Sequence, residues 1–200
     1  MDLEKFQEEM GKKVILEDDF EKVEVVGGVD QAFIGDDVIS ALVLMNRDFE
    51  ILERVYTVTR ILFPYRPGFL MFREGPPILR TLRRVKMKPD ILMVDGHGIL
   101  HPRRCGLATF VGLKSGIPTI GVGKSLLVGE AGSGEPSPVY LGSELCGYKL
   151  GKVFVSPGHK ISVETSLKVA KDFMVRGIPE PIREAHIHAN RIKAQITDRL

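Results

Sequence analysis

The chain has 200 residues, of which 44% are hydrophobic and 27% are charged, a balance that is ordinary for one folded domain spanning residues 1–200. A formal net charge of +2 is too small to identify a nucleic-acid binder. The chain has no apolar run long enough to span a bilayer, and its charged start, "MDLEKFQEEM", is no secretory signal, so we expect a cytoplasmic monomer without a membrane partner.

The first half of the chain predicts a helix, three strands that form an antiparallel meander, and a second helix. The predicted strands are rich in Val, Ile and other residues that favour extended structure, and a "GDD" turn at 35–37 separates the first two. The predicted helices cover residues 2–12 and 77–88, and the predicted strands cover residues 22–33, 38–46 and 49–60.

The second half changes to alternating strands and helices, which implies parallel pairing between its first two strands. Ser162 is placed to cap a helix. The predicted elements are a strand at 91–96, a helix at 104–116, a strand at 117–123, a flexible loop at 129–138, a hairpin or strand pair at 148–158, and helices at 163–176 and 182–196. The whole order predicts an α/β fold with a mixed sheet and helices on both faces, and the ribonuclease H-like fold is the best-known fold with this order.

Three carboxylates occupy special positions in this pattern. Asp30 lies within the first strand, Glu74 ends the apolar run Phe69 to Phe72, and Asp95 ends the strand "ILMVDG". Three clustered acids repel one another unless a cation neutralises them, and such hard oxygen ligands suit Mg²⁺ or Mn²⁺. The alternative is that backbone amides satisfy each acid at the end of a strand or in a turn. The pattern favours a metal site with one or two ions.

Basic side chains and histidines lie near the expected position of Asp95. His101, which precedes Pro102 and basic residues, is a candidate for proton transfer or phosphate contact, whereas His97 is expected to be a surface loop residue. "GVGKS" at 121–125 is no phosphate-binding P-loop, because Pro118 stands where that motif requires its first glycine. Lys124 instead follows a buried strand and is placed to stabilise negative charge on a phosphate. His186 and His188 are two apart on a predicted helix and would face different directions, which makes a poor chelating pair.

The stretch "FPYRPGFLMFRE" at 63–74 does not behave like a core strand. Pro64 and Pro67 fix the backbone and remove two donors, and Gly68 closes the turn. Tyr65 is therefore held on a rigid loop directly before a buried run that ends in Glu74.

Together with their order, five motifs resemble the endonuclease V family: "GVDQAF", "PYRPGFLMFREGPP", "VDGHGILHPRRCGLATFVG", "IGVGKS" and "PEPIREAH". They span roughly residues 25–190, and the second and third are long and specific. The resemblance implies a ribonuclease H-like fold and metal-dependent hydrolysis with Mg²⁺, with Mn²⁺ as an expected substitute. Members recognise hypoxanthine, nick the second phosphodiester bond on its 3′ side, and leave 3′-hydroxyl and 5′-phosphate ends in DNA repair.

Carried over by position, the resemblance makes Asp30, Glu74 and Asp95 the metal ligands and catalytic acids, with His101 and Lys124 as further catalytic residues. It implies a base wedge and pocket whose members are Pro64, Tyr65, Arg66, Pro67, Gly68, Gly96, Gly98 and Gly106. Base extrusion lets a protein inspect a base edge fully, and glycine backbone leaves room for a purine. The implied partner is inosine-containing DNA or, as in eukaryotic members, RNA.

The chain departs from the family pattern at two positions. Arg66 stands where an aliphatic residue is usual, and we could not assign its role. His186 stands where some members have an aspartate, which makes it a candidate for a fourth, weaker site residue. Two alternatives stay open: another nuclease with a ribonuclease H-like fold, and a non-catalytic protein that binds deaminated sites.

Overall fold

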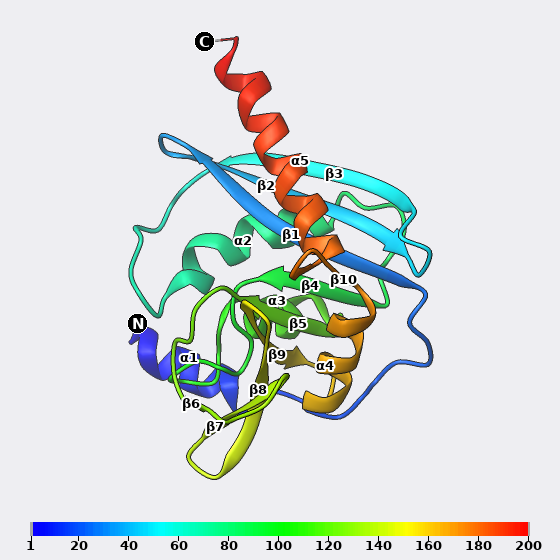
Figure 1. The fold of residues 1–200 in the computed structure, drawn as a ribbon. Coiled ribbons are helices and arrows are strands. Elements are labelled where there is room, and N and C mark those ends of the chain that lie inside the picture. Colours follow the sequence, from blue (N-terminus) through cyan, green and yellow to red (C-terminus); the bar gives the residue numbers. More distant parts are fainter. Residues whose placement is uncertain (1, 200) are drawn as a thin grey trace.

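The structure, a computed structural model, describes residues 2–199 and is built around a nine-stranded mixed sheet (Figure 1). The strand order is β3-β2-β1-β4-β5-β9-β8-β7-β6. The strands are β1 (Val25–Ile34), β2 (Asp37–Asn46), β3 (Ile51–Arg60), β4 (Ile91–Asp95), β5 (Thr119–Gly123), β6 (Glu130–Ala131), β7 (Ser137–Leu141), β8 (Glu144–Leu150) and β9 (Val153–His159). A separate two-stranded ribbon pairs β10 (Met174–Val175) with β11 (Ile178–Pro179), and the helices are α1 (Leu3–Gly11), α2 (Leu70–Leu82), α3 (Leu107–Ser115), α4 (Val163–Asp172) and α5 (Glu180–Thr197).

The predicted antiparallel meander is confirmed in the first three strands. β1 pairs with β2 and β2 pairs with β3, both antiparallel. Residues 38–45 of β2 are all buried, because the strand is covered on both faces. β3 lies at the edge of the sheet, and there the burial alternates along the strand as expected for a strand with one face in solvent.

The predicted parallel pairing is also confirmed. β4 lies parallel to both β1 and β5, and both short strands are apolar and almost completely buried. Beyond β5 the sheet becomes antiparallel again, since β9 runs opposite to β5 and β8 runs opposite to β9. The carboxyl ends of β1, β4 and β5 consequently meet at one edge of the sheet.

Two helical layers cover the sheet, as Figure 1 shows with α4 and α5 in front of the strands and α2 and α3 behind them. Leu92 and Val94 of β4 pack in the same cluster as α2 and α3, whereas Ile91 and Met93 pack in the cluster of α4. This alternation is the two-residue period of a strand, and it places the side chain of Asp95 on the α4 and α5 face.

The second predicted helix was displaced along the chain. It begins at Leu70 and ends at Leu82, instead of covering 77–88, so Pro76 and Pro77 lie inside it. A proline inside a helix removes one helical hydrogen bond, which by itself disfavours the observed boundaries. Packing offsets that loss: Met71 and Ile78 are buried, and Gly75 lets the ring of Phe110 on α3 approach so closely that an added Cβ would lie 2.4 Å from it.

Two other predicted boundaries were wrong. The predicted flexible loop at 129–138 contains β6 and the start of β7, which pair with each other. The predicted helix at 163–176 ends at Asp172, because the chain turns into the β10–β11 ribbon. The predicted cap is present, since the Ser162 side chain accepts from the backbone N–H of Thr165 at 3.1 Å.

Among residues 2–199, no helix has both the length and the apolar character needed to cross a bilayer.

Candidate active site

The sheet brings Asp30 and Asp95 together at its carboxyl edge. In the parallel pairing of β1 with β4, Val29 stands opposite Val94, so Asp30 and Asp95 are the next residues along both strands. The backbone N–H of Gln31 donates to Asp30 Oδ1 at 2.7 Å. A pair of carboxylates is thus set side by side by register alone.

Glu74 reaches the same edge from helix α2, which the sequence pattern placed only from residue 77 onward. Gln31 ties the helix to β1, because its Nε2 donates to the backbone carbonyl of Glu74 at 2.9 Å. The charges of Asp95 and Asp30 both act on Glu74, so the three predicted acids form one electrostatic cluster.

The pKa values of Glu74 and Asp95 are raised, because both acids are buried next to other carboxylates. Burial, and then the charges of Asp95 and Asp30, raise the pKa of Glu74 to about 7. Burial and the charge of Asp30 raise the pKa of Asp95 to about 6. A cation placed among these oxygens would relieve that repulsion, so the donor set fits a hard divalent ion. Within residues 2–199, however, no three His, Cys, Asp or Glu side chains stand in a ready-made ligand arrangement.

Two basic side chains engage the acids instead. Lys124, directly after β5, places Nζ 2.6 Å from Asp95 Oδ2. Burial lowers the pKa of Lys124, but the bond to Asp95 and the charges of Asp95, Asp30 and Glu74 raise it more, so the net shift is upward. Lys124 therefore stays a cation at the site, as its predicted role requires.

His186 lies at the site through helix α5. Its Nδ1 is 2.7 Å from Asp30 Oδ2, and Asn190 Nδ2 lies 3.1 Å from its Nε2 and 3.0 Å from its backbone oxygen. The helix can start this close to the sheet because Gly28 of β1 has no side chain: a Cβ there would lie 2.0 Å from the Pro181 carbonyl oxygen. His188 does not join His186, and packs against Tyr56 with ring centroids 5.9 Å apart.

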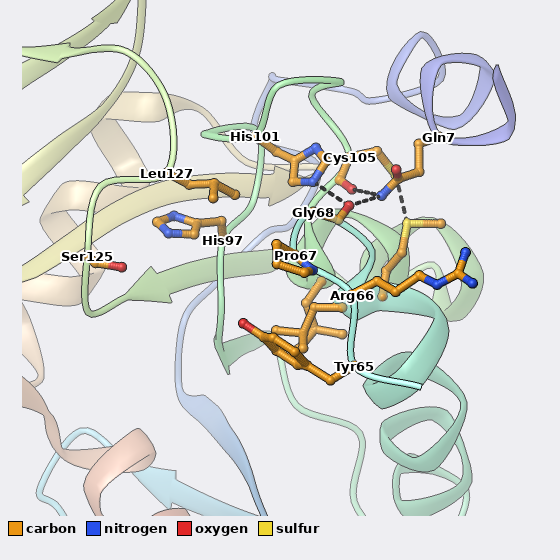
Figure 2. Close-up of a pocket in the computed structure, with 14 residues that line it drawn as sticks. Gln7, Tyr65, Arg66, Pro67, Gly68, His97, His101, Cys105, Ser125 and Leu127 are labelled. Carbon is orange, nitrogen blue, oxygen red and sulfur yellow. Dashed lines mark hydrogen bonds between the residues drawn. The ribbon is translucent and has the colours of Figure 1, made fainter. Parts of the chain in front are cut away.

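Residues 64–68 form a loop that we call the proline loop. A cavity of about 210 Å³ lies between this loop and the segment that follows β4 (Figure 2). Six of the predicted wedge, pocket or catalytic residues line it: Tyr65, Arg66, Pro67, Gly68, His101 and Gly106. Pro64, Gly96 and Gly98 are not among the described lining residues. Gly98 packs against the backbone of Pro157 behind the cavity wall.

The proline loop is held by its backbone and leaves Tyr65 free. The carbonyl oxygen of Gly68, a residue with φ of +77°, accepts from Gln7 Nε2 at 3.0 Å and Arg103 Nη2 at 3.1 Å, and lies 3.0 Å from His101 Nε2. At the other end of the loop, Arg73 Nη1 donates to the Phe63 carbonyl at 3.2 Å. Tyr65 remains 67% exposed.

His101 has both ring nitrogens engaged. The N–H of Arg103 donates to Nδ1 at 3.2 Å, so Nε2 carries the proton that is donated to Gly68. Burial lowers the pKa of His101 to about 4. This neutral, enclosed imidazole supports the proline loop, and neither nitrogen is left to contact a phosphate.

The expectation that His97 is a surface loop residue was wrong. His97 lines the cavity with Ser125 and Leu127, and burial lowers its pKa. The backbone after β4 turns back toward β5, where the N–H of Gly96 donates to the Val122 carbonyl at 2.9 Å. This turn places His97 in the cavity wall, and no pattern in the sequence predicts that position.

The structure places Arg66 next to Phe63. Its guanidinium lies 5.9 Å from the centroid of the Phe63 ring, and in Figure 2 the side chain extends away from His97 and Ser125. Among the residues that the structure describes, Arg66 makes no ion pair.

Sequence reasoning missed Gln7, which enters the cavity wall from helix α1. A signal was present, because Gln7 shares the helical spacing of Leu3, Phe6 and Met10 and so lies on the inward face. Ser125 and Leu127 were missed as well, and their loop carries no comparable pattern.

Comparisons with known proteins agree with this geometry. A family model described as Endonuclease V matches residues 8–187. An endonuclease V of Dictyoglomus turgidum is 40% identical over 94% of this chain and 88% of its own. The crystal structure of the endonuclease V of Streptomyces avermitilis superposes with a TM-score of 0.88 at 30% identity, covering 98% of this chain and 93% of that one.

A further solved structure holds a nucleic acid. The endonuclease V of Ciona intestinalis, in complex with a 24mer DNA containing an inosine followed by a ribo-adenosine, is 29% identical to this chain. It superposes with a TM-score of 0.80 and covers 96% of each chain. These likenesses confirm the ribonuclease H-like fold that the element order predicted.

Proposed function

Because the chain belongs to the endonuclease V family, we propose that it is a metal-dependent endonuclease that recognises inosine in nucleic acid and hydrolyses the second phosphodiester bond on its 3′ side. The products carry 3′-hydroxyl and 5′-phosphate ends, and the cellular role is the repair of deaminated adenine in DNA. The observation that carries the catalytic part is the acid cluster at the carboxyl edge of β1 and β4, in which burial and neighbouring carboxylates raise the pKa values of Glu74 and Asp95 next to Asp30.

Asp30, Glu74 and Asp95 are the residues that would hold the cation. Mg²⁺ is the expected ion, and Mn²⁺ is expected to substitute, because both prefer carboxylate oxygens together with water and phosphate. When bound, the cation supplies activation of a water and stabilisation of the leaving oxygen. His186 orients the carboxylate of Asp30, since its Nδ1 lies 2.7 Å from that group.

Lys124 supplies a fixed positive charge at the same edge. Its ammonium pairs with Asp95 and its pKa is raised, so it is protonated throughout the working range of such an enzyme. A cation held next to the acids stabilises the negative charge that develops on the phosphate during hydrolysis.

The proline loop and the cavity form the recognition part. An exposed Tyr65 on a loop whose ends are hydrogen-bonded can take the place of a base that leaves the stack. The cavity beside it accepts the extruded base, which is cheaper to extrude from an inosine pair than from a normal pair. The complex of the Ciona intestinalis relative with inosine-containing DNA supports this assignment.

The decisive experiment compares matched labelled DNA and RNA strands that each carry one inosine, with Mg²⁺, Mn²⁺ or EDTA. We expect cleavage between the first and the second nucleotide on the 3′ side of inosine, with divalent metal only. Preference for the RNA strand would make the protein an inosine-specific endoribonuclease. Metal-dependent cleavage that ignores inosine would favour a different nuclease of the same fold, and binding without any cleavage would leave a non-catalytic binder.

A further inference from the structure

Gln7 is a polar side chain of helix α1 that is completely buried, although its neighbours Glu8 and Glu9 are exposed. Burying an amide is unfavourable unless its hydrogen-bonding groups find partners. Here they do: Nε2 donates to the carbonyls of Gly68 at 3.0 Å and Cys105 at 3.3 Å, and Oε1 accepts from Arg103 Nε at 2.7 Å. The side chain is thus fixed through both the nitrogen and the oxygen of its amide, and Figure 2 shows the two bonds from the nitrogen.

The two carbonyls that Gln7 joins belong to different walls of the cavity. Gly68 ends the proline loop that carries Tyr65, and Cys105 lies in the segment that connects β4 to α3. Among residues 2–199, no other side chain donates to both carbonyls. The amide of Gln7 is therefore a direct link that sets the distance between the loop and the opposite wall.

Gln7 also directs Arg103. With Nε held by Gln7, the Arg103 guanidinium donates to the Gly68 carbonyl at 3.1 Å and lies 4.7 Å from the centroid of the Phe69 ring. His101 reaches the same carbonyl, so three side chains converge on one backbone oxygen. His101 and Arg103 come from the segment after β4, and Gln7 alone comes from α1.

We propose that Gln7 is a positioning residue for base recognition, by which helix α1 holds the Tyr65 loop at the spacing that an extruded purine base requires. The proposal rests on the proposed function and deepens it. A link between the walls pre-organises the cavity, so that less ordering is needed when the base enters. Without the link, the loop retains the bonds from Arg103 and His101 but loses its fixed distance from Cys105.

Two variants distinguish the effect of the hydrogen bonds of Gln7 from the effect of its volume. Gln7→Met keeps the length of the side chain and removes the amide, whereas Gln7→Glu keeps its shape and turns an oxygen toward two carbonyl oxygens. Glu8→Gln, on the exposed face of the same helix, is the matched control. Each protein is tested for single-turnover cleavage of duplexes that carry inosine or adenosine at one position, and for its thermal unfolding midpoint.

A second measurement reports on the extruded base directly. The duplex carries 2-aminopurine beside the inosine, and its fluorescence rises when the stack opens; EDTA prevents cleavage. For both Gln7 variants we expect the selectivity for inosine to fall about tenfold, equivalent to about 1.4 kcal/mol. We also expect a smaller rise in 2-aminopurine fluorescence at saturating protein. The protein concentration for half-maximal single-turnover cleavage should change more than the maximal cleavage rate. Glu8→Gln should match the wild type in every measurement.

The outcomes distinguish the inference from the function on which it rests. A wild-type protein that does not prefer inosine contradicts the proposed function itself. A wild-type protein that prefers inosine, together with a folded Gln7→Met variant of unchanged selectivity and fluorescence, overturns the positioning role alone. Failure of both variants to fold would make Gln7 a residue of stability only and would overturn it as well.

Discussion

At the scale of single residues, the site depends on charges that are unfavourable without partners. Asp30 and Asp95 are adjacent by strand register, and Glu74 joins them from a helix, so the charge of Asp30 raises the pKa values of both Glu74 and Asp95. Lys124 offsets part of this repulsion through its ion pair with Asp95, and His186 Nδ1 lies 2.7 Å from Asp30 Oδ2. The remaining repulsion is what a bound cation would remove.

Asp30→Asn tests the role of the first acid. The amide keeps the size of the side chain but removes its charge, so we expect cleavage to fall by at least about a hundredfold, while binding to the inosine duplex stays within about threefold. Single-turnover kinetics and a gel-shift titration measure the two quantities. Cleavage at the wild-type rate by the variant would contradict the metal assignment.

Tyr65→Ala tests the wedge. Tyr65 is exposed and its removal leaves the hydrogen bonds of the loop intact, so stability should hardly change. We expect binding to the inosine duplex to weaken about tenfold, on the order of the 1–3 kcal/mol of one base–aromatic stacking contact, and binding to an unmodified duplex to weaken less. Equal losses on both duplexes would argue against insertion next to the lesion.

His101 makes the stability of the folded state depend on pH, and the lowered pKa of its ring determines the direction of that dependence. The unfolded chain takes up the proton near pH 6.5, but burial holds the pKa of the folded imidazole at about 4. The stabilisation is therefore complete above pH 6.5 and is lost as the pH falls toward 4, a change on the order of 3 kcal/mol. Urea unfolding at a series of pH values gives the free energy of unfolding of the wild type and of His101→Gln. The difference between the two proteins should shrink as the pH falls over this range. A difference that is independent of pH would show that the ring titrates normally.

At the scale of elements, the site depends on how closely α5 and α2 approach the sheet. Gly28 of β1 lets the first turn of α5 lie against the strand, and Gly75 of α2 accepts the Phe110 ring. These contacts deliver His186 and Glu74 to the edge at which β1 and β4 end. Two small residues therefore determine where two larger functional groups stand.

Gly28→Ala is the element-scale test. Its methyl group would lie 2.0 Å from the Pro181 carbonyl, so α5 must shift, and His186 must move away from Asp30. We expect a loss of about 1–3 kcal/mol in the free energy of unfolding, together with reduced cleavage. Gly151→Asn is the control, because that turn has positive φ that asparagine tolerates and no atom within 4 Å of an added Cβ. Wild-type stability of Gly28→Ala would mean that the helix does not pack as described.

At the scale of the whole molecule, helix α2 joins the loop of Tyr65 to the acid cluster. The helix carries Glu74 and begins two residues after Gly68, so the loop is directly continuous with the helix that brings one acid to the cluster. Helix α1, near the start of the chain, contacts the same loop through Gln7.

The protein as a whole should be stabilised by divalent metal, and more strongly at higher pH. Without metal, raised pKa values mean that the folded acids hold protons longer than the unfolded ones, so their contribution to stability is lost as the pH rises from 4.5 to about 7 for Glu74. A cation that binds the ionised acids reverses this loss. Thermal unfolding with Mg²⁺ and with EDTA should differ more at pH 8 than at pH 5. A difference independent of pH would place the ion elsewhere.

The sequence by itself determined the antiparallel meander of β1 to β3, the parallel pairing of β4 with β5, and the strand positions of Asp30 and Asp95, because the apolar pattern of a strand indicates its burial and its ends. It could not place the start of α2, since packing against Phe110 outweighs the hydrogen bonds that Pro76 and Pro77 remove. Only the tertiary structure brought Gln7 and His97 to the cavity and showed that His186 contacts Asp30. These positions depend on contacts between segments up to 156 residues apart, and the local pattern of one segment does not identify its distant partner.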